Sequence, residues 1–292
     1  MNLRDLLSAG ILAAVCVTGA CGGGSPTGPP TPPPPPPPPP ANALPSIDSI
    51  STEGRRDGQP SRFADVGDTL DVSATVRDAE TSVDELVYQW TATAGTFGGT
   101  GRTAAWTAPA SAATRTTVTL TLRVVENYGH PGQPKIYSQE VTSTVAISLH
   151  DSVREVGEMS VRFLTEFSKP QTNDDWQDVM KDFNRSRCPD PSEYDNERVS
   201  VENHIANFTM HTYDVGPASV RINFGGRCEF NIPGDACASA PVRWDSTGPD
   251  GRGSTAGTDY LSAIYVPADS RWWLCSSRYV PNTTLGHSFY SR

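Results

Sequence analysis

The sequence has no cluster of lysine and arginine residues, and its 33 acidic residues outnumber the 23 basic ones to give a formal net charge of −10. Proteins that bind nucleic acid need a basic surface against the phosphates, and basic segments also draw proteins to anionic lipid. The composition therefore predicts no nucleic-acid partner and no membrane attachment by charge alone.

Motifs of familiar chemistry are also missing. The chain contains no C-x-x-C pair, no zinc-like cysteine spacing, no G-x-S-x-G elbow and no arrangement typical of a catalytic triad. We therefore predict no catalytic residue, no metal site and no cofactor. The apolar run Leu6–Val17 is too short for a stable transmembrane helix.

Residues 1–20 are typical of a signal peptide, with one arginine, an apolar run and the small residues Thr18–Ala20 before Cys21. This tripeptide and the cysteine resemble the lipobox of bacterial lipoproteins, although Thr18 stands where leucine is more usual. The resemblance implies that Cys21 is acylated and inserts into the lipid bilayer. Gly22, where aspartate often signals inner-membrane retention, implies a lipoprotein of the outer membrane or cell surface. Ordinary cleavage before Cys21, leaving a free thiol, is the alternative.

Residues 21–45 form a tether rich in glycine and proline, with an unbroken proline run at residues 32–40. Proline has a fixed φ and no N–H, so this segment is excluded from helices and central strands and favours polyproline II. At about 3.1 Å per residue, residues 26–40 would span roughly 45 Å. We expect a spacer; a disordered linker and a site for a proline-recognising partner are the alternatives.

Residues 46–149 alternate between apolar and polar side chains with a period of two. Such alternation is typical of strands with one face in a core, and turn residues such as Gly67-Asp68 and Gly98-Gly99 separate the runs. The pattern predicts a two-sheet β-sandwich. The apolar positions of the clearest runs are Leu70, Val72, Ala74 and Val76; Leu86, Tyr88 and Trp90; Val118, Leu120, Leu122 and Val124; and Val141, Val145, Ile147 and Leu149.

Four short motifs in this segment resemble bacterial immunoglobulin-like domains of the PKD or cadherin-like kind. They are V-G-D-T-L at 66–70, Y-Q-W at 88–90, G-T-F at 95–97 and A-W-T-A-P at 105–109. The resemblance implies a spacer or adhesive module and places Trp90 in its core. We expect Trp106 to cover the other end of that core.

An acidic loop follows the first of these runs and contains Asp78, Glu80, Asp84 and Glu85. Oxygen-rich loops suit Ca²⁺, but this spacing differs from an EF-hand loop. A solvated acidic turn is the favoured interpretation, with calcium as the alternative.

Residues 150–292 change to a helical period. We predict one helix over about 152–168, ended by Pro170, and a second from about Asn173 through Phe183, followed by a loop over 188–197. Helices followed by antiparallel strands predict an α+β domain with helices on one face of a sheet. The strands are expected at about 204–213, 219–224, 227–232, 241–245, 259–266 and 271–277.

This order of elements resembles the cone-shaped NTF2-like (cystatin-like) fold. The segments that carry the resemblance are S-V-R-F-L-T-E-F-S at 160–168, D-Y-L-S-A-I-Y-V at 259–266 and R-W-W-L-C-S-S at 271–277. Four cysteines and a glycine- and proline-rich connection at 248–257, expected to be a long flexible hairpin, depart from it. The resemblance implies a pocket between helices and sheet, which in some members holds a catalytic Asp or His.

Candidates for such a pocket are His204, His211, Asp182 and Asp175. On a regular strand His204 and His211 would point to opposite faces, so they would not line one pocket together. A hydrogen-bonded core histidine is the favoured interpretation of His204. Trp272 and Trp273 would place one indole on each face of a strand, one in the core and the other a possible platform for a ligand. The possible ligand site is therefore His204, Trp272 and Trp273.

Four of the six cysteines lie in the last third of the chain. In an exported protein an even number favours disulfides, with three possible connectivities. We prefer Cys228–Cys237, within one hairpin, and Cys188–Cys275, which closes a long loop. Free buried thiols are the alternative.

Together these features predict a non-enzymatic, membrane-anchored lipoprotein of the cell envelope. Its C-terminal domain would bind an unknown envelope protein or ligand at the end of an immunoglobulin-like stalk. The alternatives are an NTF2-like small-ligand binder or enzyme with a pocket in 150–292, and a purely structural lipoprotein.

Overall fold

The computed structural model describes residues 35, 38–113, 115–169 and 175–282. The predicted signal peptide, Cys21 and most of the proline tether lie outside the described residues, as does the expected helix cap at Asn173. Residues Pro39–Arg292 form one compact unit, and the account below concerns that unit alone.

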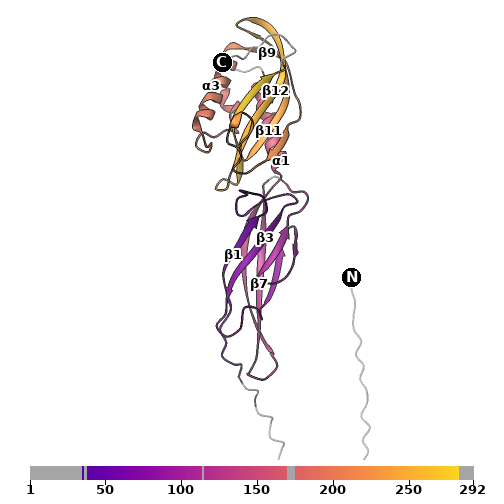
Figure 1. The fold of residues 1–292 in the computed structure, drawn as a ribbon, viewed down its shortest axis with the longest axis vertical. Coiled ribbons are helices and arrows are strands. Elements are labelled where there is room, and N and C mark those ends of the chain that lie inside the picture. Colours follow the sequence, from indigo (N-terminus) through magenta and orange to yellow (C-terminus); the bar gives the residue numbers. More distant parts are fainter. Residues whose placement is uncertain (1–34, 36–37, 114, 170–174, 283–292) are drawn as a thin grey trace, which may run out of the picture. The chain divides into compact units, whose positions relative to one another are not determined.

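The described strands form three sheets, and strands predominate over helices. The first part of the unit contains two four-stranded sheets, with the strand orders β1-β3-β6-β5 and β2-β8-β7-β4. Figure 1 labels β1 and β3, which are neighbours in the first sheet, and β7 of the second. Their bounds are β1 (Ser46–Gly54), β2 (Phe63–Asp65), β3 (Thr69–Arg77), β4 (Val87–Ala92), β5 (Thr96–Gly98), β6 (Thr103–Thr107), β7 (Thr116–Tyr128) and β8 (Tyr137–His150).

The alternation of apolar residues produces the core between these two sheets. Leu120, Leu122 and Ile147 are fully buried, as their place in the pattern requires. Trp106 is fully buried in the core. Trp90, which the resemblance places in the core, is only partly buried and packs against the core from its margin. The Trp90 indole N–H donates to the carbonyl of Gly101 (3.0 Å), which holds the ring beside the turn.

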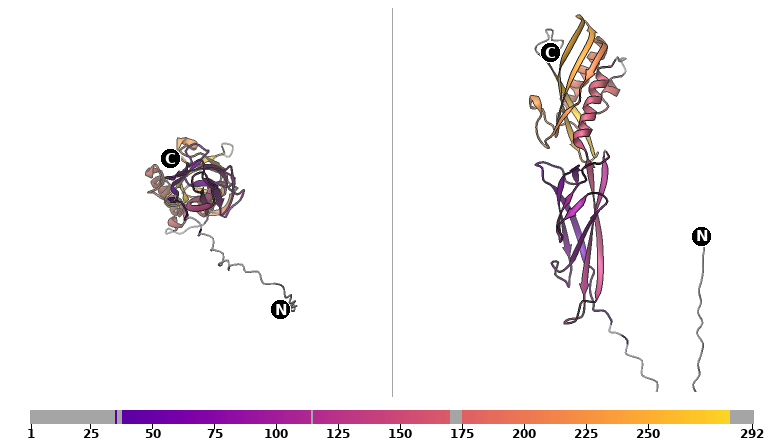
Figure 2. Two further views of the ribbon diagram at one scale, coloured as in Figure 1. Left: turned by 90° about the horizontal axis from the view of Figure 1, so that it is seen from below. Right: turned by 90° about the vertical axis from the view of Figure 1, so that its right-hand side faces the viewer.

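The second part of the unit contains the helices and the third sheet. The sheet has the order β10-β11-β12-β13, with β9 paired to β11, and α1 runs along one of its faces (Figure 2). The bounds are α1 (Ser152–Phe167), α2 (Trp176–Val179), α3 (Pro191–Asn207), β9 (Thr209–Val215), β10 (Ser219–Ile222), the 3₁₀ turn η1 (Glu229–Asn231), β11 (Ala236–Gly248), β12 (Gly251–Val266) and β13 (Arg271–Pro281).

Helix α1 lies where the sequence predicts it, and Asp151 caps its first turn by accepting from the N–H of Arg154. The prediction fails for α3, because residues 191–207 are helical instead of loop and strand. Asp190 caps this helix through the N–H of Ser192, and Pro191 occupies its first position. The expected second helix is reduced to the single turn α2.

Two further expectations about the strands are wrong. Residues 227–232 form the turn η1 and an isolated bridge from Arg227 to Pro233 instead of a strand. The connection at 248–257 is not a flexible hairpin, since Gly248 pairs directly with Gly251 and β12 already begins there. Only Pro249 and Asp250 remain as the turn.

The two cysteine pairs lie within disulfide distance in the preferred pairing. Cys188 joins Cys275 of β13, and Cys228 joins Cys237 at the start of β11. The first pair packs against Ile264 beneath Trp273, so it ties the segment before α3 to the sheet.

The β2 segment takes part in the core beneath α1. Phe63 is fully buried and belongs to the same hydrophobic cluster as Phe163 of α1 and Trp272 of β13. Its ring stacks on His150 with centroids 5.1 Å apart and meets Tyr265 edge-on at 4.5 Å. Continuous packing therefore joins the end of the two-sheet part to the helices and the third sheet.

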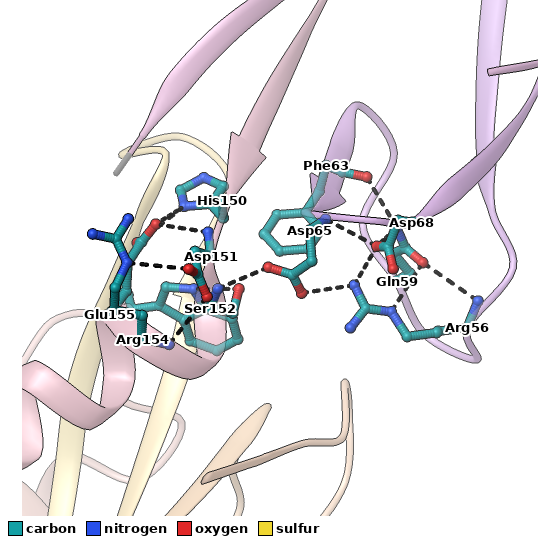
Figure 3. Close-up of polar contacts among 11 residues, drawn as sticks. Arg56, Gln59, Phe63, Asp65, Asp68, His150, Asp151, Ser152, Arg154 and Glu155 are labelled. Atoms are coloured by element: carbon teal, nitrogen blue, oxygen red, sulfur yellow. Dashed lines mark hydrogen bonds and ion pairs between the residues drawn. The ribbon is translucent and has the colours of Figure 1, made fainter. Parts of the chain in front are cut away.

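Polar contacts reinforce this junction (Figure 3). Asp65 accepts a hydrogen bond from the backbone N–H of Ser152 (2.9 Å), at the start of α1. It also forms an ion pair with Arg56 (2.8 Å). His150 Nδ1 lies 3.0 Å from both carboxylate oxygens of Glu155. A carboxylate at a helix N-terminus is favourable for the helix dipole, so Asp65 anchors α1 to β2.

Candidate functional site

The structure does not bring the three candidate ligand residues together. Trp272 is buried in the core, and its indole N–H donates to Ser152 Oγ (3.1 Å). Trp273 lies on the opposite face of β13, as predicted, but the Arg271 guanidinium covers its ring at 3.8 Å from the centroid. Its face is therefore occupied and is not an open platform.

His204 lies on α3 and not on a strand, so the argument about opposite strand faces does not apply to it. The imidazole is buried and stacks on Phe167 at 4.1 Å and on Phe208 at 5.3 Å. Burial lowers its pKa to about 4, so it is neutral at physiological pH. These contacts support a core role for His204.

The other candidates from the helical segment are also engaged in structural contacts. Asp182 is buried and forms ion pairs with Arg162 of α1 and with Arg271 of β13. Asp175 occupies the N-cap position of α2. His211 is exposed on β9 and lies 2.8 Å from the Thr247 hydroxyl.

The described part of 150–292 nevertheless contains a cavity between the helices and the sheet, with a volume of about 160 Å³. This is below the roughly 300–1,000 Å³ typical of sites for drug-sized ligands. It is close to the roughly 150 Å³ of a protein cavity that holds benzene. Its lining consists of Phe163, Leu164 and Phe167 of α1, Asn196, Glu197 and Ser200 of α3, Trp244 of β11, Asp259 of β12, and Ser277, Arg278 and Tyr279 of β13.

Two buried carboxyl groups form the polar side of this cavity. Glu197 is 5 % exposed and Asp259 4 %. Both accept hydrogen bonds from Ser277: its backbone N–H donates to Glu197 Oε2 (3.1 Å) and its hydroxyl to Asp259 Oδ1 (2.8 Å). One residue of β13 therefore holds an acid from α3 and an acid from β12 side by side.

The environment raises both pKa values. Burial raises the pKa of Glu197 to about 8, and the charge of Asp259 adds to the rise, while the Ser277 N–H and Arg278 oppose it. Burial also raises the pKa of Asp259 to about 6, against the Ser277 hydroxyl and backbone N–H groups. At neutral pH Glu197 is thus mainly protonated and Asp259 mainly ionised.

Aromatic rings form a second wall. Trp244 lies 6.1 Å from Phe167 and 5.1 Å from Tyr279, measured between ring centroids. The indole N–H of Trp244 donates to the Ser168 hydroxyl, and the Tyr279 hydroxyl lies 2.6 Å from that of Thr255. The polar groups of both side chains therefore form hydrogen bonds with Ser168 and Thr255, and the apolar parts of the rings line the cavity.

The rim is polar and more exposed. Asn196 and Ser200 of α3 are exposed, whereas Glu197 between them points inward. Arg278 pairs with Glu193 (2.5 Å), so its charge is already balanced within the protein. The helix thus presents an entrance of small polar side chains above a buried acidic pair.

The acidic loop of the two-sheet part makes local contacts. Asp84 pairs with Arg102 (3.1 Å) and Glu85 with Lys135 (2.7 Å). Asp78 accepts from the backbone N–H groups of Glu80 and Thr81. Within the described ranges, no group of three or more His, Cys, Asp or Glu side chains is placed to hold a metal ion.

Comparison of the chain with protein-family models, curated proteins and solved structures found no match. Over the part of the chain that the structure describes, no helix combines the length and apolarity needed to cross a membrane. The candidate site therefore stands on its own geometry.

Sequence reasoning missed Glu197 and Asp259. The sequence pattern predicts a loop at Glu197, where a glutamate is ordinarily solvated, and marks Asp259 only as the first residue of a strand. The available signal was the Asp190-Pro191 helix start, because it predicts α3 and places Glu197, Val201 and His204 on one face at helical spacing.

Proposed function

We propose that this chain is a membrane-anchored lipoprotein of the bacterial cell envelope whose 150–292 region binds a small ligand. Residues 46–149 would serve as an immunoglobulin-like stalk, and residues 150–292 as an NTF2-like binding domain. The observation that carries the proposal is the cavity between α1, α3 and the sheet, where Glu197 and Asp259 are both buried and both held by Ser277. Burying two acids costs free energy, and a ligand that contacts them is a reason to retain them.

The stalk role is supported by the junction at Phe63. A ring from β2 that is fully buried beneath α1 fixes how the C-terminal region is attached. A spacer needs such an attachment if it is to present a binding domain in one orientation.

Ligand binding can be tested by ligand-observed NMR with benzene-sized probes of each charge type. A Ser200→Trp variant fills the entrance, whereas Val199→Trp places the same side chain on a neighbouring exposed position of α3. We expect a probe to bind the wild type and Val199→Trp but not Ser200→Trp. Absence of binding by every probe would contradict the proposed function.

Membrane anchoring is tested separately at Cys21. Metabolic labelling with a palmitate analogue should mark the wild type and be lost in Cys21→Ala. Labelling that persists in the variant would refute acylation at this residue.

A second candidate function is acid–base catalysis at the same pair. It is favoured by the contact of both buried acids with Ser277 at the cavity and by the raised pKa of each, because a pair that retains a proton near neutral pH can supply both an acid and a base. The two functions differ in outcome: a catalytic pair would convert the bound ligand, and Asp259→Asn would abolish that conversion.

A further inference from the structure

The cavity combines an acidic side with an aromatic wall, and this combination selects one class of ligand. We infer that its ligand is a small organic monocation, an amine with an apolar body, bound between the carboxyl pair and the rings of Phe167, Trp244 and Tyr279. The inference rests on the proposed ligand-binding function and specifies its chemistry.

The charges of the lining residues support a cation. Glu197 and Asp259 share Ser277 as a donor, so they are close enough that ionising both is unfavourable, and the pair carries about one negative charge. Among the lining residues that the structure describes, Arg278 is the one basic residue, and it is paired with Glu193. A ligand with one positive charge would neutralise the remaining negative charge of the carboxyl pair.

The hydrogen bonds support an N–H donor. Glu197 accepts from the Ser277 N–H, and Asp259 accepts from the Ser277 hydroxyl and from the backbone N–H groups of Arg278 and Tyr260. Two carboxylate oxygens can accept about four hydrogen bonds, so Glu197 above all has room for a further donor. An ammonium group carries up to three donors and forms stronger hydrogen bonds with a carboxylate than a neutral group does. Anions would meet repulsion from the same atoms.

The opposite wall supports an apolar body. Aromatic rings attract cations through their faces and bury hydrocarbon favourably. The volume of about 160 Å³ limits the ligand to about the size of benzene with one short substituent.

Binding of such a ligand would lower the pKa of Glu197. An ammonium group beside the pair favours the charged form of Glu197, which is mainly protonated at neutral pH when the cavity is free. The charged groups facing Glu197 are Asp259 of β12, Arg278 of β13 and Glu193 of α3, and none of them supplies an unpaired positive charge.

Isothermal titration calorimetry on the purified full chain, with benzylamine, benzyl alcohol and benzoate as probes, tests the inference. We expect benzylamine to bind about ten- to a hundred-fold more tightly than either other probe, the range of one charge-assisted hydrogen bond. Asp259→Asn and Glu197→Gln should each weaken benzylamine binding about ten-fold or more. Glu202→Gln, the same change as Glu197→Gln at a partly exposed position of α3 outside the cavity lining, should leave it unchanged.

The outcomes separate this inference from the proposed function. If benzyl alcohol or benzoate binds as tightly as benzylamine and is excluded by Ser200→Trp, the ligand class is wrong and the cavity remains a binding site. If benzylamine binds equally well to both carboxyl variants, its site lies elsewhere and the inference fails. If no probe binds, both are overturned. Should one carboxyl variant fail to fold, the other still decides the result.

Discussion

Glu197 and Asp259 come from different elements, α3 and β12, yet accept hydrogen bonds from the same residue of β13 at 3.1 and 2.8 Å. Each is almost completely buried, and each has a raised pKa. A pair of this kind costs stability at neutral pH, because burial opposes charge and each acid opposes the ionisation of the other.

Glu197→Gln should alter the pH dependence of stability. The pKa of Glu197 is raised from 4.5 to about 8 in the folded protein, so its favourable contribution is complete below pH 4.5 and is lost as the pH rises through 8. The variant should match the wild type near pH 4 and exceed it at pH 9, by at most about 5 kcal/mol. The free energy of unfolding, measured by chemical denaturation across this range, checks the prediction.

The control is Glu202→Gln, which removes a partly exposed carboxylate, paired with Arg198 at 3.9 Å, from the same helix. Its difference from the wild type should stay nearly constant with pH. A Glu197→Gln difference that is equally constant would show that Glu197 titrates normally.

Phe63→Ala should destabilise the protein by about 3–5 kcal/mol, the usual cost of truncating a fully buried phenylalanine. The lost ring leaves a cavity among His150, Phe224 and Tyr265. Phe230→Ala makes the same change at a side chain that is 58 % exposed and should cost far less. Equal losses in the two variants, measured by denaturation, would contradict the role of Phe63 at the junction.

Removing the two disulfides should have unequal effects. Cys188 and Cys275 are 87 residues apart, whereas Cys228 and Cys237 are 9 apart. In the chain-entropy model the long loop gives about 4–5 kcal/mol and the short one about 2–3 kcal/mol. Paired serine variants, compared by denaturation, measure this difference. Mass analysis of the unreduced wild type that finds Cys188, Cys228, Cys237 and Cys275 all as free thiols would exclude both bonds.

His204 should stay neutral over the physiological range. Burial lowers its pKa from 6.5 to about 4, so the stability due to the neutral ring is present above pH 6.5 and is lost as the pH falls toward 4. The ring-proton NMR shifts of His204 should therefore hold steady from pH 8 to about 5. A titration midpoint of the His204 ring at or above pH 6.5 would contradict its burial among apolar groups and would make it a candidate catalytic residue again.

Much of the strand and disulfide pattern was predictable, because alternation and cysteine placement report directly on burial. Helix α1 was predictable for the same reason, since Val156, Phe163, Leu164 and Phe167 form one apolar stripe. Helix α3 was not predictable from such a stripe, because its buried face consists of Glu197, Val201 and His204, and only its Asp190-Pro191 start signals it. Two of these three are polar, so a search for apolar periodicity misses the helix.

The candidate site could not be predicted for a similar reason, because its buried groups are polar. Its two acids lie far apart in the sequence and are ordinary surface residues by type, so only the fold brings them to one serine. The residues that seemed informative, Trp272 and Trp273, are common in cores and carry structural contacts here. Fold class was therefore more accessible from sequence than the site.

The most direct test of the account is an NMR titration of the Glu197 side-chain carboxyl carbon, with and without benzylamine. The account predicts a midpoint of about 8 in the free protein and a clear downward shift when the cavity is occupied. A midpoint near 4.5 in the free protein, unchanged by the amine, would contradict it.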